Sequence, residues 1–370
     1  MYNPSEIENF EMLSSYLRTT PEQLDKFVNG EQYIIDWKDT SSLAKIPNYK
    51  DNSYRTDFQR FYIPKKNKRL GHRIVYKCYQ QFTKDILKIL KFNLTNIYIP
   101  HNCVHGFVPG KNTRSNALVH LGKKNLLSLD IKNFFESINK ESVNSALISL
   151  GFNESIASDL SSICTLEDKL VQGFPTSPIL ANIVCSEMDQ KIQELCQNYD
   201  ATYTRYADDL SISSNDIMPQ IDEIDSILKS FQFELNTSKT KRFKRGQNQY
   251  VTGLSISDSL YPRIPKPIKR RLRQQLYYIK KYGYHSHICR LNNLDETTNS
   301  SHTNEFIKVT RNNLKGWIDY ISSIEPQLAK RMYASFNEIE KIRYSELMSF
   351  FKENKGVLFM DYKSSLKNDK

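Results

Sequence analysis

Two adjacent carboxylates are the clearest chemical feature of the sequence. Asp208 and Asp209 follow Tyr206 and Ala207, with β-forming residues before them and an alternating Leu-Ser-Ile-Ser run at 210–213 after them. This pattern predicts two strands joined by a tight turn that carries both acids. Neighbouring like charges cost free energy unless a cation neutralises them, and hard cations such as Mg²⁺ prefer oxygen ligands. The alternative interpretation is a solvated, acidic hairpin tip.

A third carboxylate, Asp130, stands at the end of the short apolar run 126–129. Such a run is typical of a buried strand, and a buried strand can hold a carboxylate rigidly at a metal site. Phe134, Phe135 and Ile138 follow with helical spacing. Taken alone, Asp130 could equally be a helix cap.

The loop at residues 172–178 precedes a predicted amphipathic helix. Ser177 can cap this helix, and Pro178 fits its first position. One apolar face then continues through Leu180, Val184, Met188, Ile192 and Leu195. We expect this face to be core packing, whereas the loop before it could contact a substrate.

Basic residues indicate a polyanionic partner. The 370-residue chain has a net charge of +11. Residues 58–77 predict a hairpin with a basic turn at 65–71, which could close over phosphates or be simply solvated. Between Glu234 and Asp295 the only acid is Asp258, against 14 Lys or Arg interleaved with aromatic residues. Because cations hold phosphates and aromatic rings stack on bases, we expect nucleic-acid contact there.

Other properties of the sequence narrow its setting. No apolar run reaches the roughly 18 residues that a membrane span needs, and the acidic start lacks a signal-peptide pattern. We therefore expect a cytoplasmic protein with no membrane partner. The length predicts more than one subdomain.

The three acids and the basic C-terminal half together predict two-metal phosphoryl transfer. Two Mg²⁺ ions roughly 4 Å apart would stabilise the attacking and leaving oxygens of an in-line displacement. One ion would activate a primer hydroxyl and the other would bind a triphosphate.

These motifs resemble those of reverse transcriptases. In that family the first palm aspartate precedes an aromatic pair, and here Asp130 precedes Phe134 and Phe135. The family's Gln-Gly-x-Pro-x-Ser-Pro block is present at residues 172–178, and its Tyr-x-Asp-Asp hairpin is present at residues 206–209. The resemblance covers most of residues 58–320. It implies an α+β right-hand polymerase with an antiparallel palm sheet, fingers and a helical, basic thumb. The implied parts are an N-terminal helical segment (1–57), fingers (58–125), palm with some fingers elements (126–257), thumb and RNA-binding region (258–350) and C-terminal tail (351–370).

Two further motifs resemble bacterial retron reverse transcriptases. Asn-Ala-x-x-His is present as Asn116 to His120, and Val-Thr-Gly as Val251 to Gly253. Both argue against a group II intron maturase, which usually carries longer DNA-binding or endonuclease extensions.

The resemblance also implies roles for individual residues. Asp130 and Asp208 would be the main ligands of two Mg²⁺ ions, with Asp209 assisting. Phe135 would be a steric gate against the ribonucleotide 2′-OH. The other implied nucleotide-binding residues are Arg73, Lys66, Gln172, Gly173 and, near the leaving pyrophosphate, Lys239. The implied RNA-binding residues are Asn116, His120, Val251, Thr252, Gly253, Lys269, Arg270, Arg271 and Arg273. His120 alone could instead be a packed histidine.

The implied function is a retron-type RNA-directed DNA polymerase in anti-phage defence. It would bind its own structured noncoding RNA and copy part of it from dNTPs into single-stranded DNA, primed by an RNA 2′-OH. An effector or toxin protein from the same operon would be a further partner. Two alternatives are another defence-associated reverse transcriptase, template-independent or differently primed, and a catalytically silent RNA-binding scaffold.

Overall fold

The chain folds into two compact units, residues 1–252 and 253–370. The computed structural model describes residues 3–30, 32–36, 56–65, 71–292 and 301–353. The boundary between the units falls a few residues before the predicted palm–thumb boundary at 257/258. The division of the first unit into fingers and palm stays a prediction.

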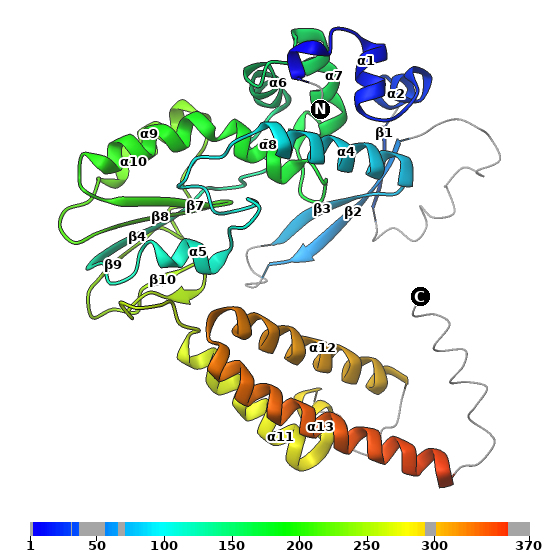
Figure 1. The fold of residues 1–370 in the computed structure, drawn as a ribbon, viewed down its shortest axis with the longest axis vertical. Helices are drawn as coiled ribbons and strands as arrows, with labels where there is room; N and C mark the ends of the chain where they lie inside the picture. The colour runs from blue at the N-terminus through cyan, green and yellow to red at the C-terminus, as the bar shows by residue number, and fades with distance from the viewer. Residues whose placement is uncertain (1–2, 31, 37–55, 66–70, 293–300, 354–370) are drawn as a thin grey trace. The chain divides into compact units, whose positions relative to one another are not determined.

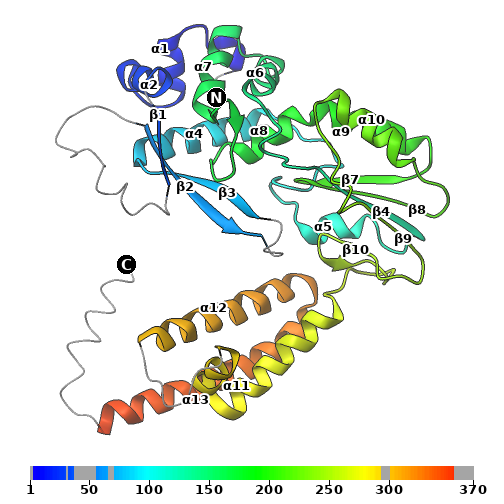
Figure 2. The ribbon, with the colours of Figure 1, turned by 180° about the vertical axis from the view of Figure 1, so that it is seen from behind.

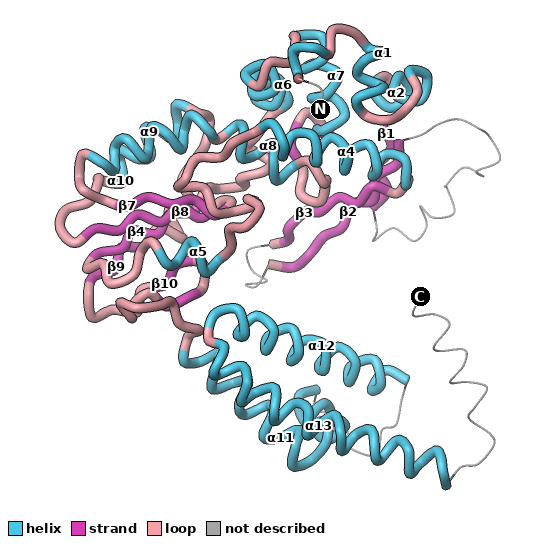
Figure 3. Tube along the Cα trace, viewed as in Figure 1, coloured by secondary structure: helices cyan, strands magenta, loops and turns pink. Residues whose placement is uncertain are grey.

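The first unit is built on a four-stranded antiparallel sheet with the order β7-β8-β4-β9 (Figure 3). Its strands are β4 (Asn125–Asp130), β7 (Thr202–Tyr206), β8 (Asp209–Ser214) and β9 (Lys241–Lys244). The apolar residues of β4 form its fully buried centre, as the run at 126–129 predicted. The predicted antiparallel sheet and the α+β class are confirmed.

Helices cover both sides of this sheet. They are α5 (Thr113–Leu118), α9 (Ser186–Gln197) and α10 (Ile221–Ser230), while α8 (Ser177–Val184) leads into α9. Figures 1 and 2 show α9 and α10 along one side of the sheet and α5 along the other. The single long helix predicted after residue 177 is wrong, because the backbone breaks at Cys185 and makes two helices. The predicted cap is also wrong: Thr176 occupies the N-cap position, and the Ser177 hydroxyl donates to the Val171 carbonyl.

A second sheet has the order β1-β2-β3 and lies beside α4 (Figure 1). Its elements are β1 (Gln32–Asp36), β2 (Thr56–Pro64), β3 (His72–Cys78) and α4 (Gln81–Ile97). The predicted hairpin is confirmed, since β2 and β3 pair antiparallel. The expectation of a helical segment over 1–57 is wrong in part. A β-forming run of residues makes β1, which pairs parallel with β2.

The N-terminal helices pack beside a second helical group. The N-terminal elements are η1 (Pro4–Glu6), α1 (Phe10–Tyr16) and α2 (Pro21–Val28). The group beside them comprises the helices α6 (Lys140–Ser149) and α7 (Glu154–Cys164), followed by the short strands β5 (Thr165–Leu166) and β6 (Lys169–Leu170). Thr20 caps α2 by accepting from the Gln23 amide, with Pro21 in the first turn. The core of the first unit runs from these helices through the four-stranded sheet.

The second unit is a helical bundle. The short strand β10 (Tyr250–Val251) ends the first unit, and β11 (Leu254–Ser255) begins the second. The bundle helices are α11 (Lys266–Asn292), α12 (Ser301–Ile324) and α13 (Pro326–Glu353). Leucine, isoleucine, methionine and phenylalanine side chains from all three helices are buried between them. Gly283, at φ 80°, divides α11 into two helical pieces. Among the described residues, no helix is both long and apolar enough to span a bilayer.

Candidate active site

The three candidate carboxylates meet at one edge of the four-stranded sheet. Asp130 ends β4 and Asp209 begins β8, and these two residues are paired in the antiparallel register. Tyr206 pairs with Asp209, so Ala207 and Asp208 form the two-residue turn between β7 and β8. The Ile131 amide donates to the Asp208 carbonyl at 2.9 Å. The fold therefore brings the predicted strand end and the predicted hairpin turn together.

A neighbouring loop supports this turn. Ala207 has a φ of 58°, the sign that tight hairpin turns require at their first central residue. A Cβ on Gly106 would lie 2.4 Å from the Ala207 nitrogen, so only glycine allows the loop to approach this closely. The His105 amide also donates to the Arg205 carbonyl at 2.8 Å. The loop thus continues the sheet beside β7 and leaves little freedom to the acidic turn.

The acids repel one another in the absence of a bound cation. Burial and the nearby Asp130 charge raise the pKa of Asp208. Burial, Asp208 and Asp130 raise the pKa of Asp209 to about 6, although part of this side chain remains exposed. The positive charges of Lys239 and Arg73 oppose both shifts. This electrostatic coupling means that additional positive charge would stabilise the cluster.

Asp130 has cationic and neutral partners. The Lys239 ammonium donates to Asp130 Oδ2 at 2.6 Å, and the Asn236 amide nitrogen donates to Oδ1 at 3.0 Å. Asp130 is buried, whereas about half of the Lys239 side chain is exposed, so the lysine can leave this position at low cost. Lys239 is therefore close enough to the acids for the predicted role near a leaving pyrophosphate.

The donor set suits a hard divalent cation. Carboxylate oxygens are the ligands that Mg²⁺ prefers, and it usually completes its shell with water and substrate phosphates. In the described ranges, no group of three or more His, Cys, Asp or Glu side chains is already positioned to hold a metal ion. The shared edge and the mutual repulsion of the acids nevertheless fit a cation that arrives with substrate.

Two of the predicted nucleotide-binding residues, Lys239 and Arg73, interact electrostatically with the acids, and the others have different neighbours. Arg73 is an exposed residue of β3, and its positive charge acts to lower the pKa of Asp208 and of Asp209. Phe135 is half-buried, with its ring centre 5.3 Å from that of Phe134 and 6.2 Å from that of Phe107. Lys66 lies outside the described residues.

Gln172 and Gly173 join the loop of the Gln-Gly block to β3. The Tyr76 amide donates to the Gln172 carbonyl at 2.7 Å, and the Gln172 side chain donates to Glu136 at 3.4 Å. Gly173 has a φ of 112°, and a Cβ there would lie 2.0 Å from the Tyr76 carbonyl oxygen. Glycine is thus required for the strand that carries Arg73 to approach this loop. Contact of either residue with a nucleotide stays a prediction.

The residues of the two retron-like motifs are mainly internal. His120 is fully buried, and its ring nitrogens lie 2.7 Å from the hydroxyls of Ser213 and Thr204. Burial lowers its pKa to about 3, so it is a neutral, packed histidine. Asn116 and Val251 are also buried. Direct RNA contact by these three side chains is therefore not supported by their positions.

The Val-Thr-Gly stretch also has a partly accessible side. The Thr252 hydroxyl donates to the Thr113 carbonyl at 3.1 Å, which ties the stretch to the start of α5. Thr252 is half-buried and Gly253 is exposed. Of the five motif residues predicted to bind RNA, these two are the ones available for direct contact.

The four predicted RNA-binding residues of α11 have different environments. Lys269 is paired with Glu325 at 3.0 Å and is mostly buried within the helical unit. Arg271 is exposed, but its guanidinium lies 5.7 Å from the ring centre of Trp317. Arg270 and Arg273 are exposed. These two arginines are the better candidates for phosphate contact.

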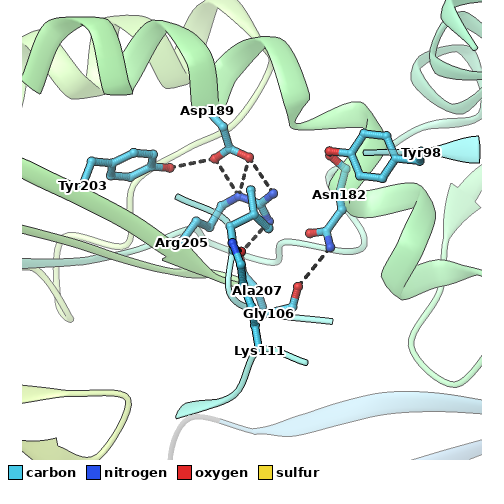
Figure 4. Close-up of polar contacts among 9 residues, drawn as sticks. Tyr98, Gly106, Lys111, Asn182, Asp189, Tyr203, Arg205 and Ala207 are labelled. Carbon is cyan, nitrogen blue, oxygen red and sulfur yellow. Dashed lines mark hydrogen bonds and ion pairs between the residues drawn. The ribbon is translucent and has the colours of Figure 1, made fainter. Parts of the chain in front are cut away.

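Sequence reasoning missed a buried ion pair beneath the acidic turn, drawn in Figure 4. Arg205 and Asp189 are both fully buried and lie 2.7 Å apart. The missed indication was Arg205 itself, because an arginine in a strand whose neighbours are buried must find a partner. The sequence gives no indication that this partner is Asp189 on α9.

Comparison with known proteins adds independent observations. The family model described as reverse transcriptase (RNA-dependent DNA polymerase) matches residues 63–282. The chain is 29% identical over 250 residues to the retron Mx65 reverse transcriptase of Myxococcus xanthus, covering 62% of this chain and 53% of the relative. It is 29% identical over 239 residues to the retron Ec86 reverse transcriptase of Escherichia coli, covering 64% and 67%. The Escherichia coli retron Ec83 reverse transcriptase is 27% identical over 313 residues, covering 79% and 91%. The match thus spans about half of the Mx65 relative and most of Ec83.

Proposed function

The chain belongs to the reverse transcriptase (RNA-dependent DNA polymerase) family, and on this basis we propose that it is the polymerase of a retron. Its reaction is the copying of an RNA template into DNA from dNTPs. The observation that carries the proposal is the convergence of Asp130, Asp208 and Asp209 at one sheet edge, next to the cations Lys239 and Arg73. The retron names of its curated relatives support the subfamily.

The chemistry proposed for this edge is nucleotidyl transfer with divalent cations, a cofactor class general in this family. When bound, two Mg²⁺ ions would supply an activated primer hydroxyl and charge neutralisation on the triphosphate. Asp130 and Asp208 would hold both ions, and Asp209 would assist. The scaffold alternative is less favoured, because all three acids and their supporting turn are present.

The surrounding side chains would bind and select the nucleotide. Arg73 would contact the triphosphate from β3, together with Lys66. Lys239 would leave Asp130 as metal binds and neutralise charge on the departing pyrophosphate. The Phe135 ring would occupy the space beside the sugar that a 2′-OH needs, supported by Phe134.

The proposed substrate is the protein's own structured noncoding RNA. We propose that synthesis begins at an RNA 2′-OH and gives a branched RNA–DNA product that acts in anti-phage defence with an effector protein. The exposed Arg270 and Arg273 of α11 and the Thr252–Gly253 turn would bind this RNA. Support comes from the retron-like motifs and from the basic stretch between Glu234 and Asp295.

The test is to purify the protein from its operon and to sequence the nucleic acid that accompanies it, with and without debranching enzyme. We expect one short DNA joined to one structured RNA, with a gel mobility that debranching changes. A matched preparation of Asp208→Asn should carry the RNA without the DNA. DNA of variable sequence, or DNA insensitive to debranching, would favour a differently primed defence polymerase.

A further inference from the structure

The buried pair of Asp189 and Arg205 needs an explanation other than stability. The Arg205 Nε and Nη2 atoms donate to the two Asp189 oxygens at 2.7–3.0 Å, and both side chains have no exposed surface. Burying two charges costs desolvation free energy that their attraction often fails to recover. Replacing such a pair with apolar residues of similar volume is often neutral or stabilising.

The remaining nitrogen of the guanidinium lies at the acidic turn. Arg205 Nη1 is 3.4 Å from the carbonyl oxygen of Ala207, in the geometry of a donated hydrogen bond (Figure 4). This carbonyl belongs to the peptide group that leads into Asp208. Because Ala207 holds a positive φ, which costs a non-glycine residue about 1 kcal/mol or more, the peptide needs external support to keep its orientation.

The other side of the same turn is supported by a second buried contact. The Asn182 side chain donates to the Gly106 carbonyl at 2.9 Å, and Gly106 packs against the Ala207 nitrogen. Tyr98 in turn donates to the Asn182 carbonyl at 2.9 Å. The turn is therefore held between two groups, of which the guanidinium is the one that donates to the Ala207 carbonyl.

The aspartate limits where the guanidinium can lie. Asp189 binds two of its nitrogens, which leaves the planar group one orientation, with Nη1 directed at the turn. The guanidinium carbon also lies 6.0 Å from the ring centre of Phe134, the neighbour of the proposed gate. One buried cation thus adjoins both the metal-binding turn and the nucleotide-binding aromatic pair.

We propose that Asp189 and Arg205 are positioning residues that orient the Ala207–Asp208 peptide so that Asp208 can share a cation with Asp130. The inference rests on the proposed function of this edge as a divalent-metal site. In this proposal neither side chain contacts the metal or the substrate. Arg205 acts through the Ala207 carbonyl, and Asp189 acts through Arg205.

The test separates metal binding from stability. Tyr203→Phe serves as the background, because the Tyr203 hydroxyl also donates to Asp189 but does not contact the turn. In that background, Asp189→Leu with Arg205→Met removes both charges without leaving an unpaired one. Mn²⁺ binding to the metal-free protein is followed by electron paramagnetic resonance, with the melting temperature measured in parallel.

The expected result is selective loss of metal affinity. Tyr203→Phe binds Mn²⁺ as the wild type does, and the combined variant melts normally but needs about tenfold more Mn²⁺, as expected for one misplaced ligand. Arg205→Lys provides a second variant if the combined one does not fold. Its single ammonium can bind Asp189 but cannot also reproduce the planar contact with Ala207, so its Mn²⁺ affinity falls similarly.

The outcomes also separate this inference from the proposed function. Wild-type Mn²⁺ affinity in a folded Arg205→Lys or combined variant overturns the positioning role, even if the wild-type protein extends primers. Weakened Mn²⁺ binding in those variants supports it, even if the wild-type protein fails to extend a primer on RNA. That failure would count against the polymerase proposal alone.

Discussion

Asp130 and Asp209 stand directly opposite each other, where β4 ends and β8 begins, and the carbonyl of the turn residue Asp208 accepts a hydrogen bond from the Ile131 amide just after Asp130. The antiparallel register therefore sets the spacing of these acids before any cation binds. A site built in this way stores electrostatic repulsion, which burial strengthens because water screens it less. The same repulsion that destabilises the metal-free protein favours binding of a divalent cation.

Asp208→Asn should separate activity from stability. We expect DNA synthesis on an RNA template to fall at least about 10³-fold, since loss of a metal ligand removes several kcal/mol of transition-state stabilisation. The melting temperature without divalent cations should stay equal or rise, because a neutral amide removes repulsion with Asp130. Primer extension and thermal melting in EDTA measure the two effects. Retained synthesis would refute the proposed mechanism.

The raised pKa of Asp209 gives a pH dependence with a definite sign. Its pKa is 3.8 in an unfolded chain and about 6 in the folded protein, so the folded state holds the proton more tightly between these values. Stability should therefore fall as the pH rises from about 4 to about 6, and Asp209→Asn should lack this component. Melting curves of both proteins in EDTA, at matched pH values, measure the difference. A wild-type curve parallel to that of the variant would contradict this coupling.

Phe135→Val should relax sugar selection. The smaller side chain opens the space beside the sugar, and one steric contact typically changes discrimination by about 10–200-fold. We expect the preference for dNTP over the matching ribonucleotide to fall by about tenfold or more, with dNTP incorporation largely kept. Single-nucleotide extension with each substrate gives the ratio. Unchanged discrimination would remove Phe135 from the gate role.

The sequence alone predicted the features that depend on residue type and short spacing. The strand-end Asp130, the acidic turn and the hairpin of β2 and β3 all follow local patterns of apolar and charged residues, and the structure has each of them. The chemistry of the site could be predicted from the sequence for the same reason. Hard-cation ligands and phosphate-binding cations can be recognised before their positions are known.

What the sequence could not give depends on tertiary contacts. The helix break at Cys185 follows no glycine or proline and places Asp189 on a separate helix, α9, where it pairs with Arg205. The two hydrogen-bond partners of His120 come from strands far along the chain, so its RNA role and its packed role could not be distinguished beforehand. Pairing of β1 with β2 is likewise a long-range contact.

Gly173→Ala should disrupt the close packing between β3 and the loop of the Gln-Gly block. An added Cβ would collide with the Tyr76 carbonyl oxygen, and the left-handed φ adds backbone strain. We expect a loss of unfolding free energy above about 2 kcal/mol. Gly246→Ala is the matched control, since its φ of 94° is also positive but its Cβ would meet nothing within 4 Å. Denaturant titrations measure both, and equal losses would argue against the close approach.

Arg270→Ala with Arg273→Ala should weaken RNA binding mainly through lost phosphate contacts. Both side chains are exposed on α11, and each lost contact should reduce the slope of log affinity against log salt concentration by about 1. Lys269→Met is the control, because Lys269 is engaged with the mostly buried Glu325 inside the helical unit. It should lower the melting temperature and leave the salt slope unchanged. Binding isotherms of the accompanying RNA at several salt concentrations measure this slope for each variant. A slope reduced in Lys269→Met alone would assign the phosphate contact to the lysine and not to the two arginines.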